Sequence, residues 1–201
     1  MRDFPSRVAR TMKLKICGLK RLEDISFVNQ AKVDYAGFVF APSRQQVSAD
    51  LARQMKAALD PRIKAVGVFV GESPEFVKQL VEEKIIDIVQ FHGDVEYALP
   101  CPTIRAFSMN SKADIKPTMC DFVLFDAQKS GTRGKAGGVF DWRLIDGYEE
   151  KPFFLAGGIN ITNIRAAAQL NPYCIDLSSG AEDGSGQKSL SKILELKETL
   201  L

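Results

Sequence analysis

Short apolar runs alternate with amphipathic stretches along nearly the whole chain. The run at 14–17 is followed by Leu22, Ile25 and Val28, which are spaced three apart as on one face of a helix. The next run, 36–40, has no polar side chain, as expected for a strand that is buried on both faces. This alternation predicts repeated units of a buried strand followed by a surface helix.

The same pattern continues to the carboxyl end and predicts eight strands, at residues 14–17, 36–40, 63–70, 85–91, 103–107, 122–125, 153–156 and 173–177. Ser48 can cap one of the intervening helices, and Ser73 with Pro74 can open another. Between the fourth and sixth strands the helical signal is weak. The sequence therefore predicts some shortened helices in that part of the chain.

Strands that alternate with helices imply a parallel sheet. An open, doubly wound sheet usually has about five or six strands, whereas eight strand–helix units are the count of the (β/α)8 barrel. We therefore predict an α/β protein: a single (β/α)8 TIM barrel of parallel strands over residues 13–201. Residues 1–12 are expected to form a flexible lead-in.

The charge balance narrows the possible partners. Lys and Arg number 27 against 25 Asp and Glu, a net charge of +2, which is too even for a nucleic-acid groove or a polybasic membrane surface. No apolar run approaches the roughly 20 residues that span a bilayer, and residues 1–12 lack the apolar centre of a signal peptide. We expect a cytoplasmic protein that binds neither nucleic acid nor membrane.

Cysteine and histidine usage limits the chemistry further. The chain has one histidine, which excludes a two-histidine metal site within the protein, and we expect no metal. Four cysteines without a C-x-x-C pair are typical of reduced cytosolic thiols. Barrel active sites lie at the carboxyl ends of the strands. Only Cys17 ends a strand, so Cys101, Cys120 and Cys174 are interpreted as small buried hydrophobic residues.

Asp126 follows the sixth predicted strand, as Cys17 ends the first. The first and sixth strands are not neighbours in a ring of eight, so the two side chains could face each other across a substrate. Each residue also has an ordinary structural explanation, as a turn former or a core thiol. Together they form the candidate acid–base pair.

The loops after the last two strands suggest a phosphate site. Gly157 and Gly158 follow the seventh strand, and Ser178, Ser179 and Gly180 follow the eighth. Barrels often bind phosphate at these two loops, because glycine lets the backbone N–H groups approach and serine adds a hydroxyl donor. A phosphorylated small molecule is therefore the predicted partner.

Other polar residues at the mouth are less specific. His92 lies just after the fourth strand, where its ring could act directly in catalysis or could equally be satisfied by the loop backbone. Arg44, after the second strand, could bind a ligand carboxylate or remain a solvated loop residue. Arg105 lies within the fifth strand, and the sequence does not decide between an inward and an outward side chain.

Seven strings, in this order, resemble those of one family: KICGL at 15–19, GFVF at 37–40, VQFHG at 89–93, LFD at 124–126, FDW at 140–142, LAGGI at 155–159 and DLSSG at 176–180. With them the chain closely resembles the phosphoribosylanthranilate isomerases of tryptophan biosynthesis. Each string is common by itself, but their combination is highly specific and covers nearly the whole chain.

The resemblance implies a reaction and roles for these residues. N-(5-phosphoribosyl)anthranilate would undergo an Amadori rearrangement to 1-(2-carboxyphenylamino)-1-deoxyribulose 5-phosphate, without a cofactor. Cys17 would take the proton from ribose C2 as general base, and Asp126 would protonate the ring oxygen as general acid. Gln90, His92 and Asp176 are expected to contact the substrate, which carries an anthranilate group. The protein would act as a monomer or homodimer.

Two segments depart from the family pattern. The family usually has S-x-R-x-V after the second strand, whereas here Gln45 stands at the place of the arginine and Arg44 comes one residue earlier. Arg44 could reach the anthranilate carboxylate through a shifted loop, or that contact could be weaker. The loop at 131–138 rearranges the usual G-G-T-G-K-T string, which leaves its role in covering the substrate open.

Other phosphate-binding barrels fit less well. A ribulose-phosphate epimerase would be a metal enzyme that needs two histidines, whereas this chain has one. An indole-glycerol-phosphate synthase relies on a catalytic lysine and glutamates near strand ends, whereas Lys15 lies inside the first strand. A non-catalytic barrel that binds a phosphorylated ligand would keep the last two loops but would not need both Cys17 and Asp126.

Overall fold

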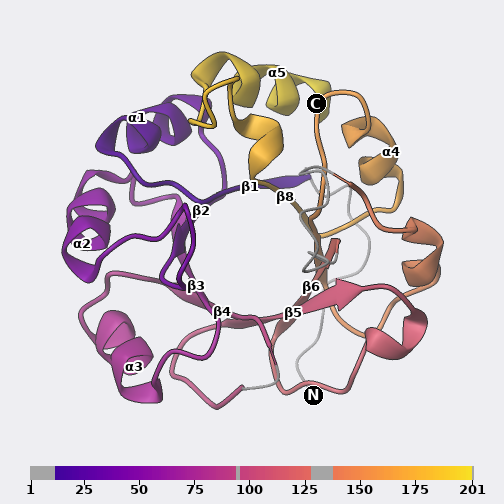
Figure 1. The fold of residues 1–201 in the computed structure, drawn as a ribbon, viewed down its shortest axis with the longest axis horizontal. Coiled ribbons are helices and arrows are strands. Elements are labelled where there is room, and N and C mark those ends of the chain that lie inside the picture. Colours follow the sequence, from indigo (N-terminus) through magenta and orange to yellow (C-terminus); the bar gives the residue numbers. More distant parts are fainter. Residues whose placement is uncertain (1–11, 94–95, 128–137, 201) are drawn as a thin grey trace.

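The computed structural model describes residues 12–93, 96–127 and 138–200. Eight parallel strands form a closed ring in chain order, with the last strand paired to the first (Figure 1). The strands are β1 Lys13–Cys17, β2 Tyr35–Val39, β3 Lys64–Phe69, β4 Ile88–Phe91, β5 Thr103–Met109, β6 Phe122–Ala127, β7 Phe153–Leu155 and β8 Cys174–Leu177. The predicted barrel is confirmed.

The helices surround the ring of strands (Figure 1). They are α1 Leu22–Ala31, α2 Ala49–Ala58, α3 Pro74–Glu82, α4 Ile164–Gln169 and α5 Leu190–Leu200, with 3-10 turns η1 Lys112–Asp114, η2 Trp142–Ile145 and η3 Ser179–Ala181. Among the described residues between β4 and β6, the only helical element is the single turn η1, as the weak helical signal predicted, and η2 is a short helical turn between β6 and β7. Within the described ranges, no helix is both long and apolar enough to cross a membrane.

Local signals set several element boundaries. The hydroxyl of Ser48 accepts a hydrogen bond from the amide of Leu51 (3.2 Å) at the start of α2. The hydroxyl of Ser73 accepts one from the amide of Phe76 (3.3 Å), and Pro74 is the first residue of α3. Both caps were predicted, because each depends only on residues within one turn.

The predicted start of β4 is wrong. The strand begins at Ile88 rather than residue 85. Ile85 and Ile86 are buried, but their amides donate to the carbonyl of Leu80 at 3.0 and 3.4 Å and form the turn after α3. Hydrophobicity alone cannot distinguish a buried turn from a buried strand. β6 also extends further than predicted, so Asp126 lies within the strand, one residue before its end.

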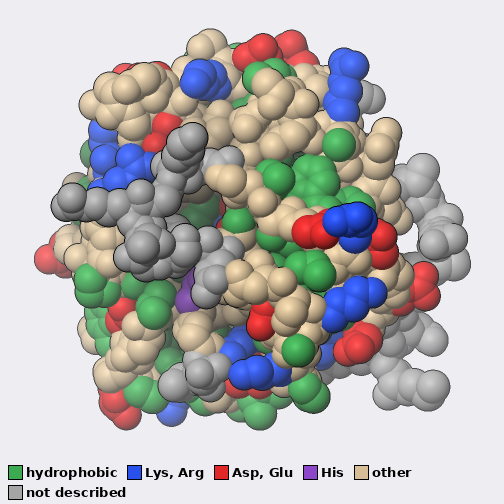
Figure 2. Space-filling view, turned by 45° about the vertical axis from the view of Figure 1, so that its right-hand side comes forward, with side chains coloured by type: hydrophobic (Ala, Val, Ile, Leu, Met, Phe, Trp, Pro, Cys, Tyr) green, Lys and Arg blue, Asp and Glu red, His purple; other side chains and the backbone are tan. Residues whose placement is uncertain are grey.

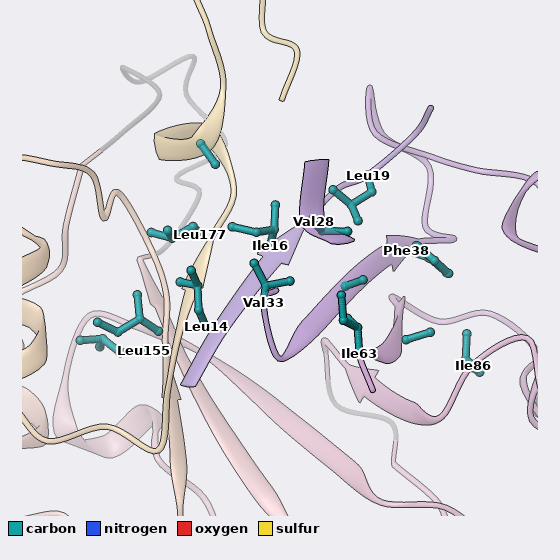
Figure 3. Close-up of a cluster of buried hydrophobic side chains, with 14 of the residues drawn as sticks. Leu14, Ile16, Leu19, Val28, Val33, Phe38, Ile63, Ile86, Leu155 and Leu177 are labelled. Carbon is teal, nitrogen blue, oxygen red and sulfur yellow. The ribbon is translucent and has the colours of Figure 1, made fainter. Parts of the chain in front are cut away.

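Successive side chains of each strand point to opposite faces, so the barrel has two apolar regions. The outward side chains of β1, β2, β7 and β8, among them Leu14, Phe38, Leu155 and Leu177 in Figure 3, form one buried cluster with residues of the surrounding helices. The inward side chains fill the barrel with the cluster Tyr35, Val66, Ile88, Ile104, Ala106, Leu124, Phe154, Ala156 and Cys174. Burial on both faces explains the continuous apolar runs in the sequence.

This alternation answers the question about Arg105. Ile104 and Ala106 belong to the inner cluster, so Arg105 points outward. Its guanidinium carbon lies 5.7 Å from the centre of the Phe107 ring.

The structure changes the interpretation of one of the three cysteines that do not end a strand. Cys174 and Cys120 are buried, but Cys101 is only partly buried, so it is not the core residue that we predicted. Cys120 also donates a hydrogen bond from its thiol to Oε2 of Glu96 (3.3 Å). The apolar neighbourhood of a cysteine in the sequence therefore did not fix its burial in the fold.

We expect Phe125→Ala to lower the free energy of unfolding by about 3–5 kcal/mol, because it leaves a cavity in a fully buried position. The Phe125 ring centre lies 5.0 Å from that of Tyr148 and 5.5 Å from that of Phe153. Urea denaturation measures the change, with Met119→Ala as the control at a side chain that is 66% exposed. Equal effects of the two substitutions would contradict this packing.

Candidate active site

The predicted catalytic and substrate-binding residues of the strands lie near the carboxyl ends of β1, β4, β6 and β8. Leu124 belongs to the inner cluster of the barrel, and Asp126 follows it by two residues, so the aspartate points to the same inner side. Cys17 packs against Val39, Ala41 and Val68 at the inner side of β1 to β3. The fold therefore directs both members of the predicted acid–base pair toward the mouth of the barrel.

A line of polar contacts crosses the barrel beneath this mouth. The ammonium group of Lys15 donates to Oδ2 of Asp176 (2.7 Å) and to Oε1 of Gln90 (2.8 Å). Nε2 of Gln90 lies 2.7 Å from Nε2 of His92. We call Asp176, Lys15, Gln90 and His92 the polar line. It connects β8, β1 and β4 and ends at His92, which is half-buried and reaches the surface in Figure 2.

Sequence reasoning did not assign a role to Lys15. Its side chain is fully buried, which is rare for lysine unless the charge is paired. Burial by itself lowers the pKa of Lys15, but the charge and hydrogen bond of Asp176, together with the thiols of Cys17 and Cys174, outweigh it, so the pKa lies above the ordinary value and the ammonium stays charged. The usable signal was a lysine in the middle of a strand predicted to be buried on both faces.

One carboxylate oxygen of Asp176 can still accept a hydrogen bond. Its Oδ2 is paired with Lys15, whereas its Oδ1 is buried and has no hydrogen-bond partner among the described residues. A buried carboxylate oxygen without a partner is costly, so a donor at this place would be stabilising. The sequence prediction that Asp176 contacts a ligand is compatible with this arrangement.

Cys17 is half-buried at the end of β1. A Cβ atom at position 37 would lie 2.8 Å from the Cys17 sulfur, so Gly37 provides the space that the thiol occupies. Burial raises the pKa of Cys17 above its ordinary value, and the charge of Asp176 adds to this, while the positive charges of Lys15 and Lys188 act in the opposite direction. Burial thus favours the neutral thiol, and the two lysines favour its ionised form.

Gly157 brings the loop after β7 against Asp126. Its φ angle is +84°, a conformation that favours glycine, and a Cβ atom there would lie 2.9 Å from Oδ1 of Asp126 and collide with the backbone nitrogen of Ala127. Only glycine lets the predicted phosphate loop lie this close to the candidate acid.

The loops after β7 and β8 also touch each other, because a Cβ atom at Gly180 would collide with the carbonyl oxygen of Ile159. A cavity of about 320 Å³ lies beside this contact, and its lining includes Gly158, Ser179 and Gly180 together with Asn160 and Lys192. The structure thus brings together residues from the two loops that the sequence selected as a phosphate site.

Glu182, which the sequence did not reveal, organises the loops around Cys17. Its carboxylate is buried and accepts from Arg44 (2.8 Å), Gln45 (2.8 Å) and Lys188 (2.9 Å). We call these four residues the Glu182 cluster. Gln45 also donates to the Ser178 hydroxyl (3.1 Å). Neither Glu182 nor Lys188 lies in a periodic pattern, so no sequence signal could have identified them.

The Glu182 cluster bears on the departure from the family pattern after the second strand. Arg44 and Gln45 both reach the same carboxylate, but the Arg44 side chain remains 62% exposed. Arg44 therefore presents a positive charge at the rim, held by Glu182, whereas the amide of Gln45 is used inside the cluster. The substrate-binding role of Arg44 stays a prediction.

Two further expectations concern the wider site. Residues 131–137 of the rearranged loop lie outside the described residues, as do residues 1–11 of the lead-in. In the parts of the chain that the structure describes, no three His, Cys, Asp or Glu side chains are grouped as metal ligands would be. That no metal takes part stays a prediction for experiment.

Comparisons with known proteins point to one family. A family model described as N-(5'phosphoribosyl)anthranilate (PRA) isomerase matches residues 14–199. A protein of Endomicrobium trichonymphae named N-(5'-phosphoribosyl)anthranilate isomerase is 45% identical over 197 residues, which cover 94% of this chain and 98% of that protein.

Solved structures give the same result. The crystal structure of phosphoribosyl anthranilate isomerase from Thermus thermophilus has a TM-score of 0.82 and 31% identity, covering 94% of this chain and 98% of that one. A second structure, of such an isomerase in complex with reduced 1-(o-carboxyphenylamino)-1-deoxyribulose 5-phosphate, has a TM-score of 0.79 and 29% identity with the same coverage.

The Glu182 cluster predicts an acid-dependent stability. Burial raises the pKa of Glu182. The hydrogen bonds and charges of Lys188 and Arg44 lower it by more, so the pKa lies below its usual 4.5. A lowered folded-state pKa stabilises the protein above about pH 4.5, and this stabilisation is lost as the pH falls through the folded-state value. Glu182→Gln should therefore cost about 1–3 kcal/mol at pH 7 and less in acid.

Urea denaturation between pH 7 and pH 3 measures this difference, with Glu149→Gln as a control at an exposed carboxylate. If the Glu182→Gln penalty were the same at both ends of the range, the ion pairs would not be the source of the stabilisation.

Proposed function

Because the chain belongs to the N-(5'-phosphoribosyl)anthranilate isomerase family, we propose that it performs this isomerisation with Cys17 as general base and Asp126 as general acid. The reaction is the Amadori rearrangement of N-(5-phosphoribosyl)anthranilate to 1-(2-carboxyphenylamino)-1-deoxyribulose 5-phosphate, a step of tryptophan biosynthesis. The protein is therefore an enzyme, an isomerase of the aldose–ketose type.

The observation that carries this proposal is the position of the two side chains. Cys17 ends β1 and Asp126 lies at the end of β6, in strands that are not neighbours in the closed ring, and both side chains are on the inner side. A substrate in the mouth would lie between them. An acid and a base on opposite sides of a sugar are what a proton-transfer isomerisation needs.

The chemistry moves protons and changes no net oxidation state. Asp126 gives a proton to the ribose ring oxygen, and the bond from that oxygen to C1 breaks to leave an iminium at C1. Cys17 takes the proton from C2, and the electron pair forms the C1–C2 double bond of an enolamine. Tautomerisation of the enolamine then gives the ketone at C2 and the amine at C1.

The thiol must be ionised before it can accept a proton. Burial raises the pKa of Cys17, so the lysine charges that oppose burial matter for the reaction. Lys15 is fixed by Asp176 and Lys188 by Glu182, at 2.7 and 2.9 Å. Both ammonium groups are thus held where they favour the thiolate.

The remaining predicted residues bind the substrate in this proposal. Gly157, Gly158, Ser178, Ser179 and Gly180 hold the phosphate, supported by the close contact of their two loops. The open acceptor of Asp176 takes a hydrogen bond from a substrate hydroxyl, and Gln90 and His92 contact the substrate from the end of β4, across the barrel from β8.

Arg44 binds the anthranilate carboxylate from the rim in this proposal. We also propose that the enzyme works in the cytoplasm, as a monomer or homodimer, without nucleic-acid or membrane partners. The mixture of acidic and basic side chains on the face in Figure 2 fits a small-molecule enzyme better than a nucleic-acid-binding protein.

Cys17→Ala and Asp126→Asn should each lower kcat by about 10²- to 10⁴-fold, because each removes one proton-transfer group. The assay follows the loss of anthranilate fluorescence with freshly made phosphoribosylanthranilate, and circular dichroism checks the fold. Cys101→Ala is the matched control, since this partly buried cysteine lies just before β5, at the opposite end of the barrel.

Near-wild-type turnover of either variant would refute its role. Absence of turnover in the wild-type protein would favour a non-catalytic binding barrel. Loss of activity on addition of a chelator would point to a metal enzyme.

Arg44→Ala should raise KM by about 10- to 100-fold with little change in kcat, because a charge-assisted contact to the carboxylate is remote from C1 and C2 of the sugar. Steady-state kinetics separate the two constants. Arg53→Ala is the control, since Arg53 pairs with Asp50 and Glu83 on the helix layer. An unchanged KM for Arg44→Ala would exclude this contact.

A further inference from the structure

We propose that Lys15 is a positioning residue that fixes the orientation of the Gln90 amide and thereby holds the His92 ring in the neutral form protonated on Nδ1. The polar line carries this proposal, because its hydrogen-bond donors and acceptors can be satisfied in only one order. The consequence for catalysis rests on the proposed function, whereas the state of the ring does not.

The order begins at Lys15. An ammonium group has three donors and no acceptor, so both of its neighbours must offer oxygen. Asp176 does so at 2.7 Å and holds the charge in a fully buried place. The atom of Gln90 at 2.8 Å must therefore be the carbonyl oxygen of the amide, because its NH2 group could not accept from the ammonium.

The orientation of Gln90 then determines the state of His92. With its oxygen turned to Lys15, the amide presents its NH2 group to Nε2 of His92 at 2.7 Å. An amide NH2 group can only donate, so Nε2 of His92 must accept through a lone pair. A neutral imidazole with an unprotonated Nε2 carries its proton on Nδ1.

The alternatives each leave two donors facing each other. A proton on Nε2, in the other tautomer or in the imidazolium, would face the NH2 group of Gln90. Turning the amide would instead place that NH2 group against the Lys15 ammonium. Gln90 is only 2% exposed, so water cannot relieve either conflict. We expect the Nδ1-protonated form to dominate by at least about tenfold.

This assignment gives His92 a specific role in the proposed reaction. The backbone amide of His92 donates to the carbonyl of Phe69 (2.9 Å), which fixes the start of the loop after β4. The ring then has one N–H group, at Nδ1, while Nε2 is engaged with Gln90. His92 is thus a hydrogen-bond donor rather than a proton-transfer group, and Cys17 remains the base.

The single histidine makes the proposal directly testable. Protein labelled with [15N]histidine gives two ring nitrogen signals, both from His92, in the ligand-free enzyme near neutral pH. We expect a protonated-type shift for Nδ1 and an unprotonated-type shift for Nε2. A protonated Nε2, alone or together with Nδ1, would overturn the proposal.

The role of Lys15 is tested with the double variant Lys15→Met/Asp176→Asn, which removes both charges and leaves no unpaired carboxylate in the barrel. Freed from Lys15, the Gln90 amide can turn, so the ring signals should show a mixture of tautomers. We expect the ratio of the Nδ1-protonated to the Nε2-protonated form to fall by a factor of about ten. Lys13→Met, at a partly exposed lysine of the same strand, is the control and should keep the wild-type signals.

If the double variant does not fold, Gln90→Leu tests the same step, because it removes the donor to Nε2 and should also give a mixture. Unchanged ring signals in a folded variant would refute the positioning role. The spectra need no substrate, so a protein that shows the expected tautomer but no turnover would refute the proposed function and leave this inference standing.

Discussion

The closure of the strand ring between β1 and β8 is the constraint on which the rest of the structure depends. Once the ring is closed, every strand is buried on both faces, and each inward side chain must pack or find a polar partner. Lys15 and Asp176 are paired residues at this seam, and their ion pair crosses it. The charge of Lys15, which would be unfavourable by itself in the interior of the barrel, is therefore stabilised by Asp176 on the neighbouring strand. Lys15 also donates to Gln90, so the polar line continues to β4.

The mouth above this line is assembled by a second buried charge. Glu182 joins the loop after β2 to the loop after β8, and Gln45 lies against Gly18, next to Cys17. The ammonium groups of Lys15 and Lys188 are both anchored by carboxylates, so their charges stay near the thiol instead of turning to solvent. Two ion pairs thus shape the electrostatics of a site whose thiol is otherwise disfavoured as an anion by burial.

Local features of the sequence were predicted well because their causes are local. The caps at Ser48 and Ser73 depend on one helical turn each, and the strand pattern depends on burial of both faces. The start of β4 was misplaced because Ile85 and Ile86 are as apolar as a strand but lie in a turn. The burial of Cys101 was overestimated, since the covering of a residue before β5 depends on segments far away in the chain.

The sequence by itself determined the eight strands, the barrel and the set of residues at the strand ends, because periodicity and strand polarity decide these. Only the tertiary structure decided that Lys15 meets Asp176 and Gln90, and that Arg44 and Gln45 share Glu182. These partners are separated by up to 161 residues and come together through ring closure, which no local pattern encodes. The hydrogen-bonding state that we propose for His92 depends on the same closure, because Lys15 on β1 orients Gln90, which lies two residues before His92 on β4.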